Sequence, residues 1–508
     1  MDEPIFLLFI AIPLFASPLI YFSYHFGPTA QRLGFHRWLA FLVLLATWIP
    51  FALAAHDLHN GEALEYTVYG ITLRMDGLSL LLGAVALGLG TFVVLYSGAY
   101  MSKETGQDKF FAMLVAMVGV MIGLGFATDL FNLWVWFEAM AVTSYLLVAF
   151  YRDQPASLEA GLKYLMQSAA GSVLVLLGIG LVLSQTGTTD MRAIRAANVA
   201  DSKILLAAGA LFIIGFGVKT ALVPLHTWLP DAHSQAPSGI SAMLSGVVIE
   251  TGLVAMLRAL IALTGVTPTW GELLMGFGAA NMLLGNLMAL RQTQVKRLLA
   301  YSSLAHVGYM LVGIGVAAYY AQSTTVVGAQ AGAQGGLFHL VNHGLMKGLA
   351  FLSAGAFLYV LHIAAGSHAP LTRDDLAGAS KRYPWAALSL SIAVLGLGGI
   401  PPLAGFMSKW QIFVGGFQTK NETIQILVVF AALNSVLSLA YYAPIVNIIY
   451  RHEPSEAVKA GQPLPLTMTI PLVIMALGVI VIGLWPNLLD WLTEPAGSAL
   501  LRAFAGGL

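Results

Sequence analysis

Long apolar runs dominate this sequence, since about fourteen stretches of roughly 20 mostly apolar residues follow one another between Pro4 and Leu489. A membrane-spanning helix needs about that length to cross the hydrocarbon core. Charged residues make up 9% of the chain and hydrophobic residues 58%, whereas a soluble domain usually carries about 25% charged residues. So little polar material cannot cover a soluble globule of 508 residues, and the sequence predicts an all-α integral membrane protein.

The expected spans are 4–23, 37–55, 77–99, 109–127, 130–150, 160–184, 204–229, 237–264, 271–290, 299–317, 332–361, 384–415, 424–450 and 467–489. We expect three of them to be interrupted, the seventh at Pro224, the eleventh near His343 and the twelfth at Pro401-Pro402. A proline within a membrane helix removes a backbone hydrogen bond and kinks the helix. The first span follows Asp2-Glu3 and no basic segment, so it reads as a retained helix and not as a cleaved signal peptide.

The basic residues of the loops predict the orientation of the chain. With the N-terminus outside, the cytoplasmic loops hold fourteen basic residues: Arg32, Arg37, Lys103, Lys109, Arg152, Lys163, Arg291, Lys296, Arg297, Arg373, Lys381, Arg382, Arg451 and Lys459. The outer loops hold six: Arg74, Arg192, Arg195, Lys203, Lys420 and Arg502. Three of these six lie in 185–203. Because basic loops stay on the cytoplasmic side, both termini are expected on the outer side and the number of spans is expected to be even.

The spans divide into four groups without a soluble domain or a low-complexity linker. Helices 1 to 3 occupy residues 1–108, helices 4 to 8 residues 109–264, helices 9 to 13 residues 265–450, and helix 14 with the tail residues 451–508. Five is an odd number, so the second set of five helices would be inverted relative to the first. The broken seventh and twelfth helices each carry a lysine, Lys219 and Lys409, and inverted repeats with broken helices are typical of transporters.

Five charged residues lie within the apolar spans, away from the helix ends: Glu138, Lys219, Glu250, Lys347 and Lys409. Each would cost about 2.5–3.5 kcal/mol at the bilayer centre, and unpaired they would cost on the order of 12–18 kcal/mol together. They must therefore face the protein interior, pair with one another or line water. Buried charges of this kind usually mark an ion path.

Glu138 and Lys219 are expected to form a pair. A nearby carboxylate favours the ammonium form of a lysine, while burial disfavours it. A change in their separation would then load or release a proton on Lys219. The alternative is a structural ion pair that only fixes the register of the helices.

Three residues in FHLVNHGLMKGLAFLSAG, His339, His343 and Lys347, follow one another at spacings of four and share one helix face. A polar stripe packed against another helix is one interpretation, and a metal site is another, since two histidines four apart can chelate a metal. No acidic ligand is near in sequence, so we prefer a proton relay, for which histidine is well suited. His306 in AYSSLAHVGYM either extends this relay or is an ordinary core histidine.

Two further stretches carry polar residues beside a helix break. Lys409 follows the break in GGIPPLAGFMSKWQIF, where the glycines and prolines predict irregular backbone that lines a cavity, and it reads as the exit end of the path. Asp231 and His233 lie at the cytoplasmic turn after Pro224. They could guide ions, but we expect them to cap the next helix.

The chain resembles the antiporter-like subunits of respiratory complex I and related multisubunit cation–proton antiporters. The resemblance is strong over about residues 70–450 and rests on WFEAMAVTSYLLV, VKTALVPLHTWLPDAHSQAPSGISAMLSG, VKRLLAYSSLAHVGYM, HLVNHGLMKGLAFL and GIPPLAGFMSKW, in the order typical of the family. It implies fourteen helices, two inverted five-helix repeats, broken helices 7 and 12, and proton translocation without a bound cofactor or metal.

The resemblance also implies roles for individual residues. Glu138 and Lys219 match the glutamate–lysine pair of the first half, whereas His339, His343 and Lys347 match the central hydrophilic axis. Lys409 matches the lysine that some branches of the family have in the last half-channel.

Two residues depart from the pattern of the family. Glu250 stands where many relatives have a lysine that links the two half-channels, so its partner should be basic, with Lys347 as the candidate. Gln294 replaces the acid that often precedes the lysine of the tenth helix.

These observations predict a proton-translocating subunit of an NADH:quinone oxidoreductase-type complex in a bacterial or archaeal plasma membrane, with no redox centre on this chain. Its partners would be the lipid bilayer, other membrane subunits and protons, with Na⁺ as the alternative ion. Alternatives are a subunit of a multisubunit Na⁺/H⁺ antiporter, of a membrane-bound hydrogenase complex or of an energy-coupled inorganic-carbon uptake system, or a scaffold without transport. The net charge of zero suggests no nucleic-acid partner, and the absence of cysteines rules out disulfides and cysteine-ligated clusters.

Overall fold

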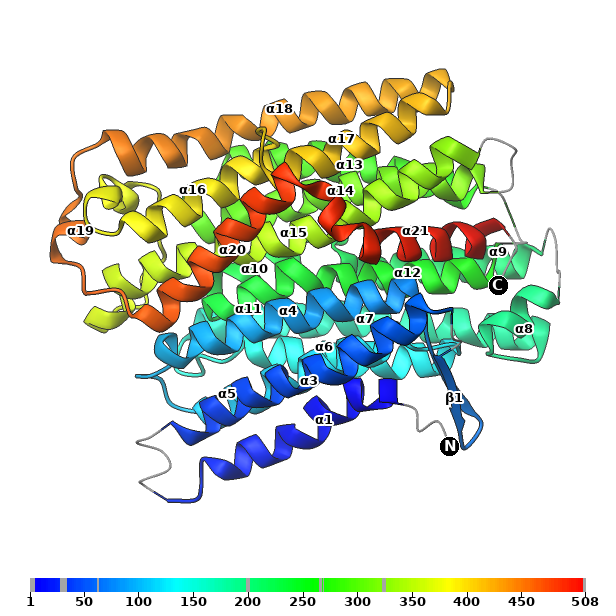
Figure 1. The fold of residues 1–508 in the computed structure, drawn as a ribbon, viewed down its shortest axis with the longest axis horizontal. Helices are drawn as coiled ribbons and strands as arrows, with labels where there is room; N and C mark the ends of the chain where they lie inside the picture. Colours follow the sequence, from blue (N-terminus) through cyan, green and yellow to red (C-terminus); the bar gives the residue numbers. More distant parts are fainter. Residues whose placement is uncertain are drawn as a thin grey trace.

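The computed structural model describes residues 5–27, 34–61, 64–197, 202–264, 267, 269–321 and 326–505, with the backbone alone for residues 326 and 327. The chain forms a bundle of helices that run roughly along the longest axis of the molecule (Figure 1). α1 begins and α21 ends at the same end of this bundle, on the right in Figure 1. We call this the predicted outer end, and the opposite one the predicted cytoplasmic end.

Within the described residues, 13 helical stretches are long and apolar enough to cross a membrane. They are α1 (Ile5–Ser23), α3 (Phe35–His59), α4 (Gly77–Tyr100), α5 (Gln107–Gly125), α6 (Leu130–Val148), α7 (Pro155–Thr186), α9 (Lys203–Thr220), the stretch Ser238–Ala262, α13 (Trp270–Leu290), α14 (Val295–Tyr320), α15 (Val326–Leu361), α18 (Glu422–Arg451) and α20 (Leu466–Leu484). The helices α16 (Pro384–Gly398) and α17 (Ala404–Gln418) add one more crossing in two pieces. The predicted class, an all-α membrane protein, is confirmed, and the described residues form about 13–14 spans where about fourteen were predicted.

The two helix breaks predicted from proline lie where expected. α9 ends at Thr220 and continues after Pro224 as α10 (Trp228–Gln235), whereas α16 and α17 are separated by the segment that contains Pro401 and Pro402. The peptide bonds Val223-Pro224 and Pro401-Pro402 are both cis. The predicted break near His343 is wrong, because α15 is one continuous helix from Val326 to Leu361. That stretch contains no proline, and polar side chains by themselves leave the backbone hydrogen bonds of a helix intact.

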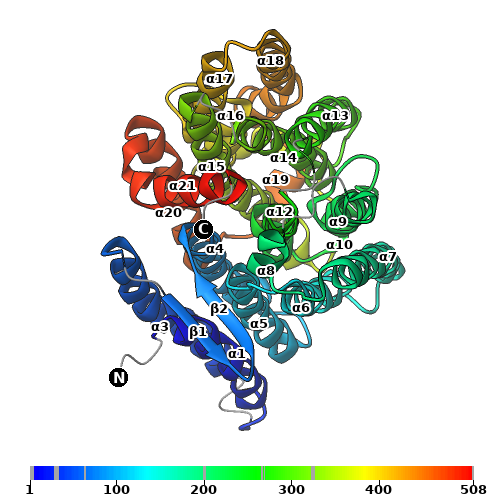
Figure 2. The same cartoon turned by 90° about the vertical axis from the view of Figure 1, so that its right-hand side faces the viewer.

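The centre and the periphery of the bundle differ in burial. The apolar windows of Ser238–Ala262 and of α14 are completely buried inside the protein, whereas those of α1 and α3 are 28% and 33% buried. Figure 2 shows α12, α14 and α15 surrounded by the other helices. The peripheral helices expose apolar side chains such as Phe15 and Ile426, as expected for surfaces that face lipid. Any charge within these fully buried windows is therefore kept away from lipid.

The eighth crossing contains a distortion that the sequence pattern did not reveal. It is composed of α11 (Ser238–Met243), a π-helical turn (Leu244–Val248) and α12 (Ile249–Ala262). A π-helical turn adds a residue to a helix, rotates the side chains that follow, and occurs often at functional sites. Glu250 lies two residues after this turn.

Several short elements lie outside the apolar pattern. β1 (Leu64–Val68) and β2 (Ile71–Met75) form an antiparallel hairpin at the predicted outer end, with Tyr69 and Gly70 both at positive φ in the turn. The remaining elements are α8 (Met191–Ala196), α19 (Glu456–Ala460), and the 3₁₀ turns Ile363–Ala365, Asp374–Leu376, Ala379–Lys381 and Pro486–Leu489.

The predicted last span, 467–489, corresponds to α20, which ends at Leu484, and a further helix follows it. α20 is followed by the 3₁₀ turn and by α21 (Asp490–Ala505), which packs against α4 and α15 and extends toward the predicted outer end (Figure 1). A β-carbon at Gly77, where α4 begins, would clash with the backbone of Pro495 in α21. The polar residues at the start of α21 hid it from a search for apolar runs.

Candidate functional site

The break between α9 and α10 exposes backbone groups and places Lys219 beside them. Asn281 of α13 binds both sides of the break, since its amide donates to the Ala221 carbonyl at 3.2 Å and its Oδ1 accepts from the Val223 N–H at 2.8 Å. Ala221 adopts a left-handed conformation with φ of 58°, which is strained for a residue with a β-carbon. The backbone is therefore held open by a side chain from a neighbouring helix.

The Lys219 ammonium is bound by hydroxyl groups of α7. Its Nζ donates to Tyr164 Oη at 2.9 Å and to Ser168 Oγ at 3.3 Å, and it lies 4.4 Å from the centroid of the Tyr164 ring. The aliphatic part of Lys219 packs against Gly252 of α12. Hydroxyl groups can accept a hydrogen bond from the ammonium and donate one to the neutral amine, so both states of the lysine find partners here.

Glu138, the predicted partner of Lys219, does not contact it directly. The structure has no ion pair between them within hydrogen-bonding distance, although Glu138 lies within electrostatic range of the lysine. Oε1 of Glu138 is buried and has no hydrogen-bond partner among the described residues. The ring of Phe137, whose centroid is 5.8 Å from Lys219 Nζ, also borders the ammonium.

Glu250 is hydrogen-bonded to His343, and not paired with Lys347 as predicted. The distance from His343 Nδ1 to Glu250 Oε1 is 2.7 Å, and both side chains are completely buried. The two helices approach closely at a pair of glycines, because a β-carbon at Gly344 would lie 2.7 Å from the carbonyl oxygen of Gly246. The π-helical turn and this glycine contact together direct Glu250 toward the histidine on α15.

The histidines form a connected chain. His306 Nδ1 is 3.0 Å from His339 Nε2, and His339 Nδ1 is 2.8 Å from Ser408 Oγ. The ring of His306 also lies against that of His343, with 5.2 Å between the ring centroids. The structure therefore brings His306 of α14 into line with the two histidines of α15. Because each imidazole has two nitrogens, the hydrogen bond between His306 and His339 can pass a proton from ring to ring. His343 joins this pair through a ring contact, since its Nε2 has no hydrogen-bond partner among the described residues.

Lys347 and Lys409 lie near this chain on two different elements. Lys347 donates to the carbonyl of Leu299 at 2.8 Å and to Ser302 Oγ. Lys409, next in sequence to Ser408, donates to the carbonyl of Leu397 and to Ser435 Oγ, both at 2.8 Å. The Leu397 carbonyl lies in the last turn of α16, where the break leaves carbonyl groups without a helical partner.

Seven of the eight residues predicted for the site are no more than 2% exposed: Lys219, Glu250, His306, His339, His343, Lys347 and Lys409. Glu138 is partly buried. From Glu250 to Ser408 the residues form one contiguous set of hydrogen bonds and ring contacts. Glu138 and Lys219 lie beside it, joined to it by the packing of Lys219 against α12.

The structure adds two buried groups that the sequence interpretation missed. Lys296, expected in a cytoplasmic loop, is 5% exposed, and its Nζ donates to the carbonyl of Ala236 at 2.6 Å. His233, expected to cap a helix, is completely buried and stacked on Phe351, and neither ring nitrogen has a hydrogen-bond partner among the described residues. His233 lies within electrostatic range of both Lys296 and Lys347.

A cavity near the predicted cytoplasmic end reaches Lys296. Its lining is rich in polar side chains and includes Lys296, Gln294, Tyr151 and His368. Lys296 is thus the point where a buried cation meets a polar cavity. The only signal in the sequence for these two buried groups was that the polar segments 231–236 and 294–297 come shortly after the ends of predicted spans.

Asp231 is the second residue for which the capping prediction is wrong. Its carboxylate bridges α7 and α14 by accepting from Lys163 at 3.1 Å and from Arg297 at 2.6 Å. Burial raises the pKa of Asp231, but the hydrogen bonds and charges of Arg297 and Lys163 outweigh burial and hold the pKa below its ordinary value. The carboxylate therefore anchors α10 to its neighbours as an ion.

A helical membrane bundle whose central helices enclose lysines, histidines and a glutamate beside two helix breaks defines an antiporter-like membrane subunit. Residues 127–438 match the family described as NADH:quinone oxidoreductase/Mrp antiporter, TM. Residues 66–111 match the family described as NADH-Ubiquinone oxidoreductase (complex I), chain 5 N-terminus. The chain belongs to the NADH:quinone oxidoreductase/Mrp antiporter family.

Its relatives are subunits of several multisubunit membrane complexes. The chain is 35% identical over 435 residues to F(420)H(2) dehydrogenase subunit N of Methanosarcina mazei, covering 84% of this chain and 85% of the relative. It is 30% identical to NADH-quinone oxidoreductase subunit N 2 of Roseiflexus castenholzii, covering 92% and 94%. A chain of the membrane-bound sulfane sulfur reductase, an archaeal respiratory membrane complex, superposes with a TM-score of 0.86 at 26% identity and complete coverage of both chains. These relatives establish an antiporter-like subunit of complex I-like complexes without fixing one complex.

Proposed function

We propose that this chain is a proton-translocating membrane subunit of an NADH:quinone oxidoreductase-type complex. The observation that carries the proposal is the buried series Glu250, His343, His306, His339 and Ser408, in which each member contacts the next. A series of titratable groups on the central helices would be costly without a function. Similarity to subunit N of NADH-quinone oxidoreductase over 92% of the chain supports this type of complex.

In the proposed path, protons reach the site from the predicted cytoplasmic end. The polar cavity leads to Lys296. His233 lies within electrostatic range of both Lys296 and Lys347 and would connect them. Lys347 passes protons toward the histidine chain through His343, one helical turn away on α15. Ser408 connects the chain to Lys409, which we assign as the exit end.

Charge coupling between the two halves would run through Glu250. A proton on His343 is stabilised by the Glu250 carboxylate at 2.7 Å, whereas a proton on Glu250 leaves the histidine neutral. Lys219, whose stem packs against α12 two residues beyond Glu250, responds to the same charge and to that of Glu138. Redox chemistry on partner subunits would drive these shifts.

The two sets of five helices, in 109–264 and 265–450, are proposed to be inverted repeats, each with one broken helix. This arrangement is supported by the opposite directions of the two broken helices, as α9–α10 and α16–α17 run in Figure 1. Both Lys219 and Lys409 then lie on the predicted outer side of their breaks, which explains why one precedes its proline and the other follows it.

The replacement Lys219→Ala tests the path. In the assembled complex reconstituted into vesicles, this variant should lose proton translocation, followed with a pH-sensitive dye, while the complex still assembles. Lys459→Ala is the matched control, because the Lys459 ammonium is exposed and pairs with the exposed Glu456. Translocation at the wild-type ratio in Lys219→Ala would remove Lys219 from the path.

The replacement Glu250→Lys tests the linking role. It would place a cation beside His343 and near Lys347, so that the neighbouring groups can no longer share a proton across the 2.7 Å contact. We expect translocation per redox turnover to fall by about tenfold or more, the effect of roughly 1.4 kcal/mol. Coupling that is the same with either charge would show that Glu250 is not on the path.

The ion, the type of complex and the orientation each have a direct test. A flux of radioactive sodium in place of a pH change would indicate a Na⁺/H⁺ antiporter subunit. Co-purification with quinone-binding and iron–sulfur subunits supports our proposal. Co-purification with small antiporter subunits would indicate an antiporter, and co-purification with hydrogenase subunits would indicate a hydrogenase complex. A carbonic-anhydrase-like partner would indicate an inorganic-carbon uptake system. Because the chain has no cysteines, single cysteines introduced near either terminus can be labelled from outside to test whether both termini face outward.

A further inference from the structure

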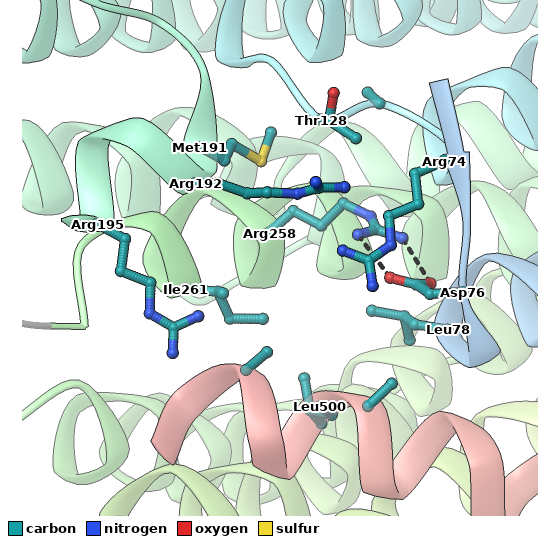
Figure 3. Close-up of a pocket in the computed structure, with 13 residues that line it drawn as sticks. Arg74, Asp76, Leu78, Thr128, Met191, Arg192, Arg195, Arg258, Ile261 and Leu500 are labelled. Atoms are coloured by element: carbon teal, nitrogen blue, oxygen red, sulfur yellow. Dashed lines mark hydrogen bonds and ion pairs between the residues drawn. The ribbon is translucent and has the colours of Figure 1, made fainter. Parts of the chain in front are cut away.

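A second pocket lies at the predicted outer end, away from the buried series, and four arginines line it. Arg74 comes from β2, Arg192 and Arg195 from α8, and Arg258 from α12. Figure 3 shows these side chains with Asp76, the one acidic residue of the lining. Three of the four, Arg74, Arg192 and Arg195, are among the six basic residues that the sequence places in the outer loops.

Two of these arginines are paired with carboxylates. Arg258 binds Asp76 through two nitrogens at 2.9 and 3.2 Å and also donates to the Gly125 carbonyl at 2.6 Å. Arg192 binds Glu65 of the hairpin. These contacts fix the two guanidinium groups and order the wall of the pocket.

The other two arginines have no carboxylate. Both terminal nitrogens of Arg195 are buried and have no hydrogen-bond partner among the described residues, which leave out the adjacent 198–201. Within the same described part of the chain, the Arg74 guanidinium forms no hydrogen bond or ion pair. Burial lowers the pKa of Arg195, yet a guanidinium remains charged in proteins. The buried, unpaired terminal nitrogens of Arg195 are costly unless an anion binds them. Arg74 is half-buried, and its guanidinium group is available to the same anion.

The position of the pocket relative to the span ends, and the apolar wall opposite its arginines, indicate which class of anion it would bind. Asp76 caps the first turn of α4, and Ile261 lies at the end of α12, so the pocket lies where spans end and where lipid phosphates are found. Leu78, Ile261 and Leu500 of α21 form an apolar wall (Figure 3). An amphipathic anion would satisfy both the guanidinium groups and this wall.

We propose that this arginine pocket binds a phosphate group, and that an anionic phospholipid supplies it. The planar fork of arginine donates two parallel hydrogen bonds to phosphate oxygens. The unpaired Arg74 and Arg195 would bind the phosphate, while Arg192 and Arg258 are held in place by their carboxylates. This site is separate from the proposed proton path and does not depend on it.

The test uses the full-length chain purified in detergent and native mass spectrometry with added lipid. The wild-type chain should retain phosphatidylglycerol in preference to phosphatidylcholine. The double variant Arg74→Gln/Arg195→Gln should bind phosphatidylglycerol about tenfold or more weakly, as expected for lost charge-assisted hydrogen bonds. Arg502→Gln is the matched control, because it removes a positive charge at the same end of the molecule but outside this pocket.

The outcomes separate the two sources of phosphate. Loss of phosphatidylglycerol in the double variant but not in Arg502→Gln supports the phospholipid. Thermal stabilisation by inorganic phosphate that the double variant loses, without any preference for phosphatidylglycerol, supports the free ion as the source. Arg195→Lys, which keeps the charge but lacks the fork, should bind at an intermediate level. Equal binding of lipid and of inorganic phosphate by all variants would overturn the proposal.

Discussion

Lys219 and Lys409 lie beside the two helix breaks, and both ammonium groups contact an aromatic ring and hydroxyl oxygens. Lys219 is bound by the hydroxyls of Tyr164 and Ser168. Lys409 is bound by the carbonyl of Leu397 and the hydroxyl of Ser435 and lies 4.6 Å from the centroid of the Tyr309 ring. In both sites, polar but uncharged groups therefore stabilise a buried ammonium.

They differ in the charges around them. Glu138 lies within electrostatic range of Lys219, whereas no carboxylate of the described residues lies within such range of Lys409. Lys409 is instead adjacent to Ser408, which ends the histidine chain. The comparison teaches that a carboxylate can tune the first lysine, whereas in our proposal the protonation of histidines tunes the second.

The largest expected effect comes from removing the second lysine. Lys409→Met should abolish proton translocation in the reconstituted complex, as Lys219→Ala does, because the proposed exit has no other ammonium. Lys420→Met, at the exposed end after α17, serves as the control. If Lys409→Met keeps more than half of the wild-type rate, the two breaks are not equivalent in function and the path ends elsewhere.

The next effect distinguishes the two lysines by their partners. Glu138→Gln removes the carboxylate that stabilises a charged Lys219 and should slow translocation by about tenfold, since nearby charges shift titrations by one unit or more. Ser435→Ala, which removes one of two neutral partners of Lys409, should slow translocation by about threefold or less, as for one neutral hydrogen bond. Both rates are measured in the same vesicles, and equal effects would contradict the difference drawn here.

The third effect concerns the backbone of the breaks. Gly399 follows the end of α16 with φ of 81°, and a β-carbon there would lie 3.0 Å from Ser435 Oγ and 3.4 Å from Lys409 Nζ. Gly399→Ala should therefore destabilise the chain by about 1–2 kcal/mol, the cost of a left-handed conformation for a residue with a β-carbon.

The corresponding residue at the first break is Ala221, which already holds a β-carbon in the left-handed conformation. Ala221→Gly should change stability by less than about 0.5 kcal/mol, since relief of strain and added freedom of the unfolded chain oppose each other. Unfolding of the purified variants by detergent titration measures both changes. A larger loss in Ala221→Gly than in Gly399→Ala would reverse the comparison.

The last effect distinguishes how the cytoplasmic ends of the two broken helices are anchored. α10 is held by Asp231 and its two cationic partners, whereas the start of α16 is held by Arg382, which donates to the backbone carbonyls of Lys459 and Gly461. The pKa of Asp231 is below its ordinary value of about 3.9. Its contribution to stability is therefore present above about pH 4 and is lost as the pH falls through the folded-state pKa.

Asp231→Asn should consequently lower the stability at neutral pH by about 0.5–1 kcal/mol, as for partly exposed ion pairs. The difference from the wild type should shrink as the pH falls below about 4. Glu453→Gln, which removes the exposed partner of Lys381, should change stability at neither pH. Thermal unfolding at the two pH values provides the measurement, and a loss that is the same at both values would show that Asp231 does not act through its charge.

Much of the architecture could be predicted because it depends on local properties of the chain. The length of the apolar runs defined the membrane class and the spans, and Pro224, Pro401 and Pro402 marked two breaks, since a proline disrupts a helix wherever it occurs. The same local reasoning was wrong for α15, where polar residues without a proline were taken for a break. It also missed α21 and the β-hairpin, because polar residues interrupt both segments and neither contains a long apolar run.

The sequence by itself determined that Lys219, Glu250, Lys347 and Lys409 are buried charges, because they occur in runs that can only be membrane spans. It did not reveal the buried Lys296. Only the tertiary structure decided their partners. Glu250 meets His343, 93 positions away, and not Lys347, because a π-helical turn rotates it and a glycine contact brings the two helices together. Likewise, the arginines of β2, α8 and α12 converge only through packing. Contacts between distant segments depend on helix rotation and close approach, and a linear pattern of residues specifies neither.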